Sequence, residues 1–266
     1  MSRLSNSSKP IYTVDPASID ALRAMKRLPD VLYYQGDLEL LQRPKIAIVG
    51  SRKPSAYTRQ MTALLAASLS RRGICIVSGA AMGVDAIAHK NAGPHNTIAV
   101  MANGLDIRYP AINASLIERI ENEGLVLSRF AEKEAARPWS FVVRNEMVVA
   151  LGDVLIVTQA ERDSGTMRSV EYAQAMGKPI YVLAHRIGES EGSNTLLRHA
   201  KAQAIYDIEA FCEALAPMPQ QIEDALLQYC QSAPDYEEAY RRFGEQLFEY
   251  ELEGKIRIEN SKVYLS

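Results

Sequence analysis

Short runs of apolar, mostly β-branched residues recur along the chain and alternate with segments of helical period. The apolar runs lie at residues 45–50, 73–79, 96–104, 124–128, 153–160, 178–184 and 202–207, and helical patterns cover residues 58–72, 84–91, 115–122, 141–151 and 167–176. Continuously apolar strands that alternate with helices indicate a parallel sheet covered on both faces. Because such crossovers are right-handed, the pattern predicts an α/β fold with a doubly wound, mostly parallel, Rossmann-like sheet.

The two ends of the chain depart from this regular alternation. Residues 1–43 form a short N-terminal extension, in which "IDALRAMKRLPD" predicts a helix that ends at Pro29. The Rossmann-like domain then covers residues 44–216, and "APMPQQ" at residues 216–221 has the composition of a linker. Residues 217–266 show three short helical patterns and two alternating runs around Asn260-Ser261, which predict a hairpin. Three helices and a hairpin are typical of a small winged-helix-like domain.

The composition is that of an ordinary globular protein, with 47% apolar and 23% charged residues among 266. No apolar run reaches the length of roughly 18 residues that a membrane span needs. The first ten residues lack the apolar core of a signal peptide, so we expect a cytoplasmic protein without a membrane partner. Cys75, Cys212 and Cys230 lie far apart and show no metal-ligand spacing, so we expect free thiols, no metal site and no cofactor.

The charge is close to zero overall but unevenly distributed. The formal net charge of −2 argues against a protein that coats nucleic acid with a basic surface. Residues 217–266 carry ten acids and five bases, which leaves an excess of three positive charges on residues 1–216. A polyanion would therefore bind locally on the larger part of the chain.

Polar, glycine-containing turns follow three of the predicted strands. In a parallel sheet these turns meet at one edge, where ligands bind. Glycine permits a close backbone approach, and helix-start amides and hydroxyls bind anions. The turns contribute Gly50, Ser51 and Arg52 after the first strand, Ser78 and Gly79 after the second, and Ser164, Gly165 and Thr166 after the fifth. The loops GxxxxGK[ST] and GxGxxG are absent, which disfavours ATP-type chemistry and NAD binding.

Two residues near these turns have alternative interpretations. Asp85, just after the second turn, either caps the following helix or orients an arginine, and we favour the helix cap. Phe141 precedes Arg144 and Asn145, and a ring beside cations is typical of single-stranded nucleic-acid sites, in which rings stack on bases. Phe141 or the nearby Trp139 would otherwise belong to the core.

Taken together, the motifs "VGSRKPSAY", "VSGAAMGVDAIAH", "NGLDIRYPAIN", "SFVVRNEMVVALGDVLIV", "SGTM" and "GSNTLL" resemble those of the bacterial DNA-processing protein A (DprA/Smf) family. The resemblance covers about residues 30–207. It implies a Rossmann-like core that binds single-stranded DNA, forms a homodimer and loads a RecA-type recombinase during natural transformation. It further implies that Gly50, Ser51 and Arg52, with the adjacent Lys53, line the DNA pocket, that Phe141 stacks on a base, and that Arg144 and Asn145 support the rim, with Arg137 as the nearest preceding cation.

The chain also departs from the family pattern at several positions. The usual Arg-Asn-Arg is Arg-Asn-Glu here, and Glu146 would repel phosphate unless it points away from the pocket or pairs with an arginine. The usual Ser-Gly-Gly has Ala80 as its third residue, Arg129 stands where an acid is typical, and Ala184-His185 replaces a typical Pro-Gly.

We therefore predict a single-stranded DNA-binding protein without catalytic residues that protects incoming DNA and passes it to a recombinase. The dimer contact would involve the segment 193–202 or the strand before it. The acids Glu249, Glu251 and Glu253 make the C-terminal domain unsuited to duplex DNA and favour a protein-interaction module. The alternative is an enzyme that splits nucleoside monophosphates, because "SGTM" resembles the phosphate-binding turn of such enzymes. These enzymes have a glutamate soon after the Gly-Thr pair, whereas Glu171 lies five residues after Thr166, which argues against this alternative. A passive nucleotide sensor would leave Phe141 unexplained.

Overall fold

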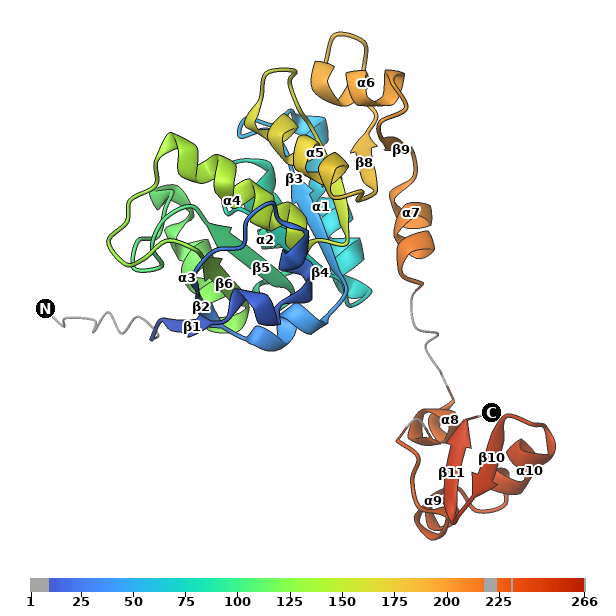
Figure 1. The fold of residues 1–266 in the computed structure, drawn as a ribbon. Coiled ribbons are helices and arrows are strands. Elements are labelled where there is room, and N and C mark those ends of the chain that lie inside the picture. The colour runs from blue at the N-terminus through green and yellow to red at the C-terminus, as the bar shows by residue number, and fades with distance from the viewer. Residues whose placement is uncertain (1–9, 218–223, 231, 266) are drawn as a thin grey trace, which may run out of the picture. The chain divides into compact units, whose positions relative to one another are not determined.

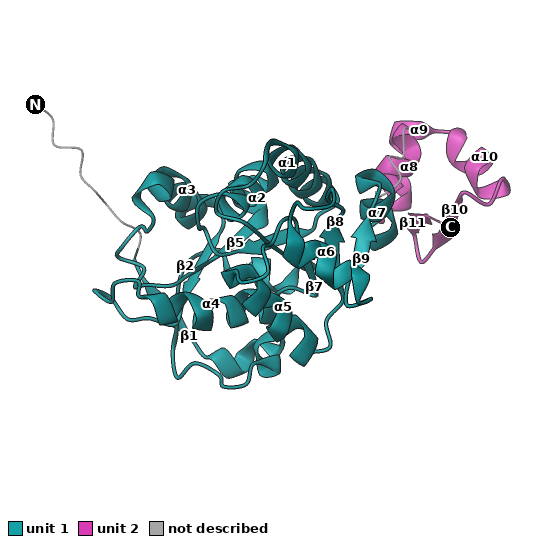
Figure 2. Ribbon diagram, turned by 90° about the horizontal axis from the view of Figure 1, so that it is seen from above, with its two compact units in different colours: residues 1–218 teal, residues 219–266 magenta. Residues whose placement is uncertain are grey.

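The computed structural model describes residues 10–217, 224–230 and 232–265. The chain divides into two compact units, residues 1–218 and residues 219–266, which Figure 2 shows in separate colours. Among the described helices, none is both long enough and apolar enough to cross a membrane.

The first unit, in its described part, is built on a nine-stranded sheet in the order β1-β2-β6-β5-β4-β3-β7-β8-β9 (Figure 1). Seven strands run parallel to one another: β3 (Lys45–Val49), β4 (Cys75–Ser78), β5 (Thr97–Met101), β6 (Leu125–Ser128), β7 (Val154–Val157), β8 (Ile180–Leu183) and β9 (Gln203–Ile205). The chain builds outward from β3 to β6 and then returns to the other side of β3 with β7. The carboxyl ends of β3 and β7 therefore form the switch point at which α/β sheets bind ligands.

Helices cover both faces of the sheet, as the predicted doubly wound fold requires (Figure 1). Alternate residues of β3 divide between the faces: Ile46 and Ile48 belong to one core, Ala47 and Val49 to the other. One face carries α1 (Ala56–Arg71), α2 (Val84–Ala92), α3 (Ala114–Glu123) and α7 (Ile208–Leu215), and the other carries α4 (Pro138–Leu151), α5 (Gly165–Ala175) and α6 (Glu191–Arg198). The α/β fold with a mostly parallel sheet is thus confirmed.

The N-terminal segment differs from its prediction. It contributes the edge strand β1 (Tyr12–Val14) and the strand β2 (Leu32–Gly36), which pairs antiparallel with β1 on one side and with β6 on the other. The predicted helix over "IDALRAMKRLPD" is wrong, because only Asp20–Ala24 is helical and it is a short 3-10 helix. Leu22 and Met25, three residues apart, both enter the core, a spacing that suits three residues per turn.

The second unit has the elements that the sequence predicts. The described residues form α8 (Ala225–Cys230), α9 (Tyr236–Phe243), α10 (Gln246–Leu252) and a hairpin of β10 (Ile256–Glu259) and β11 (Lys262–Leu265). Asn260 and Ser261 adopt positive φ angles of 50° and 61° at the turn, as a tight two-residue hairpin requires. A small core gathers around Leu226, Leu247 and Val263. The first helical pattern predicted here, "IEDALLQYC", starts at residues 222–223, which lie outside the described residues, as do residues 218–221 of the predicted linker.

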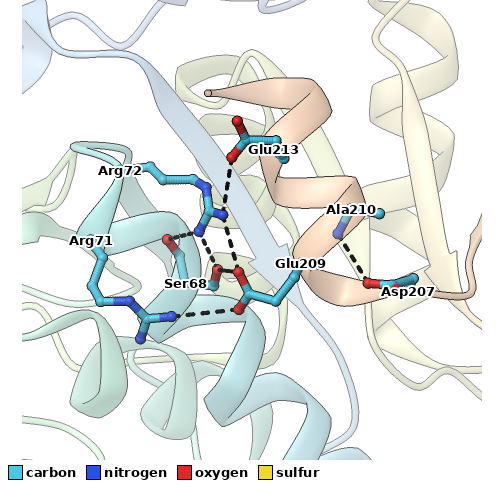
Figure 3. A network of polar contacts seen from close by, with 7 residues as sticks. All are labelled: Ser68, Arg71, Arg72, Asp207, Glu209, Ala210 and Glu213. Atoms are coloured by element: carbon cyan, nitrogen blue, oxygen red, sulfur yellow. Dashed lines mark hydrogen bonds and ion pairs between the residues drawn. The ribbon is translucent and has the colours of Figure 1, made fainter. Parts of the chain in front are cut away.

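A network of ion pairs attaches α7 to α1 (Figure 3). The side chain of Arg72 is only 6% exposed, and its guanidinium contacts Glu209 at 3.0 Å and Glu213 at 3.3 Å. Ser68 accepts a hydrogen bond from Arg72 and donates to Glu209 at 3.0 Å. Asp207 caps α7 by accepting the Ala210 N–H at 3.0 Å. The end of the first unit is therefore held by directional bonds as well as by apolar packing.

A second buried polar group lies between α2 and β5. His89 is fully buried, and its Nε2 accepts the Ala80 N–H at 3.3 Å. The Nδ1 proton is therefore directed at Thr97 Oγ1, which itself donates to the Ile76 carbonyl at 2.9 Å. Burial, with the nearby Arg144 cation, lowers the pKa of His89 to about 3. The imidazole is neutral in the folded protein at physiological pH.

Replacing Arg72 should loosen α7. Arg72→Met keeps most of the carbon stem but removes the guanidinium that joins Ser68, Glu209 and Glu213. Because both carboxylates are more than half exposed, solvent screening limits the loss of melting temperature to about 2–4 °C. Thermal unfolding measures the shift. Arg71→Met is the matched control, since its one ion pair is 3.5 Å long and exposed on both sides; an equal shift in the two variants would contradict the network.

The buried His89 should make stability depend on pH. Its folded pKa is about 3, below the unfolded value of about 6.5, so below pH 6.5 only the unfolded chain takes up this proton. The free energy of unfolding should therefore fall by about 1.5 kcal/mol between pH 6.5 and pH 5. Urea unfolding should show this loss in the wild type and in the exposed-site control His199→Gln, but not in His89→Gln. Parallel pH profiles for wild type and His89→Gln would rule out the neutral buried imidazole.

Candidate nucleic-acid interface

A cleft of about 550 Å³ lies at the switch point between β3 and β7. Its walls come from the turn after β3, the turn after β7 and the first half of α4. A smaller pocket adjoins it and shares Arg52, Phe141 and Arg144. Of the residues predicted from the sequence, the two hollows are lined by Gly50, Ser51, Arg52, Gly79, Phe141, Arg144, Asn145, Ser164, Gly165 and Thr166.

The other predicted residues lie outside these hollows. Ser78 is fully buried and its hydroxyl donates to the Ile48 carbonyl at 2.6 Å, so it joins β4 to β3. Lys53 is exposed on the turn after β3. Arg137 is exposed at the N-terminus of α4, where its backbone exchanges two hydrogen bonds with the Ser140 hydroxyl. Lys53 and Arg137 are therefore exposed cations directly beside the lining residues Arg52 and Pro138 in the chain, whereas Ser78 stabilises the sheet.

The turn after β3 is held against the start of α2 by backbone contacts. The Val84 N–H donates to the Ser51 carbonyl at 3.1 Å. Gly83 has a φ of +80°, and a Cβ at this position would stand 2.4 Å from the Ser51 carbonyl oxygen. A Cβ on Gly50 would likewise meet a Val84 methyl at 2.7 Å. Only glycine fits at both positions, so the sequence of this turn determines how closely the two strand ends approach.

Arg144 is the buried centre of the site. Its guanidinium is 4% exposed and donates to the carbonyls of Gly79 and Val100, the latter at 2.7 Å. A Cβ on Gly79 would stand 2.3 Å from the guanidinium carbon, so this glycine is needed to admit the arginine. Burial lowers the pKa of Arg144, yet an arginine keeps its proton from an ordinary pKa above 12. Arg144 thus places one fixed positive charge beneath the cleft.

Asp85, for which the sequence suggested either a helix cap or a role beside an arginine, belongs to the same buried centre. Its carboxylate accepts the N–H groups of Gly79 and Ala81 at 3.2 and 3.3 Å. The predicted helix cap is wrong, because α2 begins after Gly83 without a side-chain cap and Asp85 bonds back to the preceding turn. Burial raises the pKa of Asp85, and the Arg144 charge opposes that rise. The carboxylate therefore fixes the turn after β4 and compensates part of the buried positive charge.

Two cations lie close to the ring of Phe141, which lines both hollows. The exposed Arg52 guanidinium is 5.1 Å from the ring centroid, and that of Arg144 is 5.9 Å away. The half-exposed Tyr109 ring lies 6.1 Å from it at an angle of 49°. Cations and a second ring around a half-buried aromatic form the arrangement that stacks a base while holding its phosphate.

The turn after β7 offers amide donors. No side chain caps the eleven-residue helix α5, and the Ser164 hydroxyl donates instead to the Glu161 carbonyl at 2.7 Å. The free amides and the helix dipole favour an anion here. Ser169, which lines the cleft one turn further on, is 1% exposed, and its hydroxyl has no partner among the described residues. These two observations together identify a site for a polar or anionic group.

The smaller pocket contains residues that the sequence-based selection missed. Met82, Asn103 and Tyr109 line it, the last followed by Pro110 after a cis peptide bond. Asn103 is 1% exposed; its amide nitrogen donates to Gly104 and Ile107, but its oxygen has no partner among the described residues. The motif "NGLDIRYPAIN" contains Asn103 and Tyr109, but spacing alone did not indicate that this loop folds back beside Phe141.

Glu146 faces away from the cleft. It is 9% exposed, accepts the Lys26 N–H at 2.7 Å and lines a different groove. The expected repulsion of phosphate is avoided because the carboxylate is directed toward the N-terminal segment. Ala80 has a φ of +53°, which explains why a glycine is usual there; its methyl group packs in the core formed with α3.

Within the described ranges, no group of three or more His, Cys, Asp or Glu residues could hold a metal ion. The three cysteines are free and buried. Glu171, the carboxylate considered for nucleotide cleavage, pairs with Arg168 at 2.8 Å and does not line the cleft.

Comparison with known proteins identifies relatives of the chain. Residues 9–216 match the family model for DNA recombination-mediator protein A. The chain is 33% identical over 199 residues to protein Smf of Synechocystis sp., covering 72% of this chain and 50% of the relative. It is 35% identical over 176 residues to the DNA processing protein DprA of Streptococcus pneumoniae, covering 64% and 61%. The chain therefore spans between half and about three-fifths of the length of these two relatives.

Two solved structures are similar to the first unit. DNA processing protein A from Helicobacter pylori, studied for its single-stranded DNA binding mode, has a TM-score of 0.74 and 41% identity, covering 77% of this chain and 95% of that one. DprA from Streptococcus pneumoniae has a TM-score of 0.70 and 31% identity, covering 77% and 73%. The fold, the motifs at the sheet edge and the family match over residues 9–216 agree: the chain belongs to the DNA recombination-mediator protein A family.

Proposed function

We propose that this protein binds single-stranded DNA in the cleft between β3 and β7 and that it acts by binding rather than by catalysis. The observation that carries the proposal is the half-buried Phe141 ring with the exposed Arg52 guanidinium 5.1 Å from its centroid. Stacking on a ring accepts any base, while a guanidinium beside it holds a phosphate. The similar Helicobacter pylori structure, which concerns single-stranded DNA binding, supports the same ligand.

Three features of the cleft contribute to DNA binding in this proposal. The turns at Ser51 and at Ser164–Thr166 supply backbone amides for successive phosphates, and Ser51 and Thr166 add hydroxyls. Arg144 contributes a fixed charge from below and holds the helix that carries Phe141. Gly165 leaves room for the DNA backbone, because no atom lies within 4 Å of where its Cβ would stand.

We extend this proposal to the biological role of the bound DNA. The protein would protect incoming single strands during natural transformation and pass them to a RecA-type recombinase in the cytoplasm. A homodimer would allow two clefts to share one strand and raise the effective concentration of each. The helix α6 and strand β8 are our candidates for the dimer contact. The S. pneumoniae and Bacillus subtilis relatives are named DNA processing proteins, which supports a role in DNA processing.

We assign a separate role to the second unit. Glu249 and Glu251 lie on α10, whose end also exposes 89% of Leu252. Acidic and apolar side chains on one short helix suit a protein partner better than a DNA groove. We therefore propose that residues 217–266 form a winged-helix-like protein-interaction module.

Two substitutions separate charge from stacking. Fluorescence anisotropy with labelled oligo-dT should show that Phe141→Ala weakens binding roughly tenfold or more, since stacking contributes about 1–3 kcal/mol per base, with the salt dependence nearly unchanged. Arg52→Ala should weaken binding and reduce the slope of log affinity against log salt by about 0.7, the value for one phosphate contact on a single strand. Arg119→Ala, an exposed cation on α3 outside both hollows, is the control. Wild-type affinity in both test variants would refute the site.

A substitution at Gly165 tests whether the DNA backbone approaches the start of α5 closely. Gly165→Ala adds a methyl group that meets no protein atom within 4 Å and has no positive φ to strain, so the melting temperature should be kept or slightly raised. Binding of oligo-dT should nevertheless weaken several-fold, because the methyl group blocks close contact with the helix-start amides. Gln174→Ala, exposed near the other end of α5, should bind as wild type does. Equal affinity for Gly165→Ala and wild type would remove this turn from the interface.

A further inference from the structure

A second groove, of about 700 Å³, lies beside the N-terminal half of α4 and outside the cleft described above. It shares no lining residue with that cleft. Trp139 and Val143 enter it from α4, Phe130 and Arg129 from the loop after β6, and Lys26 and Arg27 from the N-terminal segment. We call it the Trp139 groove. Its chemistry combines aromatic rings with cations, the two components of a single-strand binding surface.

The rings give the groove a firm aromatic surface. Trp139 is 53% exposed, whereas Phe130 is 5% exposed. Their ring centroids are 5.7 Å apart at an angle of 67°, so the buried Phe130 supports the indole edge-to-face. A large ring that is held in place yet half open to solvent can stack on a base at little cost in side-chain entropy.

The charged groups favour an anion. Lys26, Arg27 and Arg129 line the groove, and none of them forms an ion pair within the described part of the chain. The two carboxylates of the groove already have partners: Glu146 accepts the Lys26 N–H at 2.7 Å, and Glu134 accepts the Ala131 N–H at 2.8 Å. Positive charge therefore exceeds negative charge, and the cations are available to an incoming polyanion.

The groove is continuous with the proposed DNA site. Trp139 and Phe141 are two residues apart in the first turn of α4, so they project from different sides of the helix. Pro138, at the helix start, lines the first cleft. A strand that leaves Phe141 has to cross only the end of a helix about 10 Å wide to reach Trp139.

We propose that the Trp139 groove is a second stacking site for the same DNA strand, so that single-stranded DNA wraps around the N-terminus of α4. Phe141 and Trp139 each stack on a base, and Lys26, Arg27 and Arg129 bind the phosphates between and beyond them. The inference rests on the proposed function, because the strand is first anchored in the cleft between β3 and β7. It extends that function by predicting a longer binding site than the cleft alone provides.

The only tryptophan of the chain makes a direct test possible. The full chain is titrated with labelled oligo-dT of about 4 and about 16 nucleotides, which bracket common single-strand site sizes. Anisotropy of the label reports binding, and the emission of Trp139 reports stacking in the groove. With the longer strand, emission should be quenched along the same curve as the anisotropy rises.

Substitutions provide an independent measurement. Trp139→Leu should lose roughly tenfold or more in affinity for the longer strand, and Trp139→Tyr, which keeps a ring, should recover most of it. Arg129→Gln should reduce the salt slope for the longer strand, while the control Arg119→Ala leaves it unchanged. Circular dichroism and melting curves establish that each variant is folded. The quenching of Trp139 emission is measured on the wild-type protein, so that test does not depend on the folding of any variant.

The outcomes separate the two proposals. If the longer strand binds by anisotropy but leaves Trp139 emission unchanged, and Trp139→Leu binds it as wild type does, the groove holds another occupant such as a peptide. The inference then fails while the proposed function stands. If neither strand changes the anisotropy, single-stranded DNA binding itself is refuted, and the groove proposal is overturned with it.

Discussion

The candidate site depends on one buried interaction, the insertion of Arg144 between the ends of β4 and β5. The guanidinium donates to the carbonyls of Gly79 and Val100, and Gly79 has no Cβ to obstruct it. A buried cation is costly unless it is hydrogen-bonded and compensated by charge, and Asp85 supplies that compensation through the same turn. Because Arg144 lies on α4, this interaction sets the position of the helix end on which Phe141 and Trp139 stand.

A nearly neutral protein can attract a polyanion when its positive charge is concentrated locally. The amides of α5, Arg52 and the fixed Arg144 charge meet at the switch point of the sheet, where the geometry of parallel strands brings their ends together. The Trp139 groove adds exposed cations on the other side of the same helix. Both surfaces combine a supported ring with positive charge, and in our proposal one strand connects them.

The N-terminal segment takes part in this arrangement rather than standing apart from it. Leu22 and Leu32 are fully buried in the core that also contains α4. The Lys26 N–H binds the carboxylate of Glu146 at 2.7 Å, which draws this acid away from the cleft. The residue that looked unfavourable in the sequence thus secures the segment that carries two of the groove's cations, Lys26 and Arg27.

The sequence alone determined the order of the strands β3 to β9 and of most helices between them, because buried parallel strands need unbroken apolar runs and helices need their own period. It also determined the positions of the turns, since Gly50 and Gly79 admit close contacts that other residues would block. The tertiary structure decided what local patterns do not encode: the pairing of β2 with β6, the role of Asp85, and the burial of Arg144, which looks like any solvent-exposed cation in the sequence. It also brought Asn103 and Tyr109 beside Phe141 and gathered Lys26, Arg129 and Trp139 into one groove. Those contacts join residues distant along the chain, and only the packing of elements against one another brings them together.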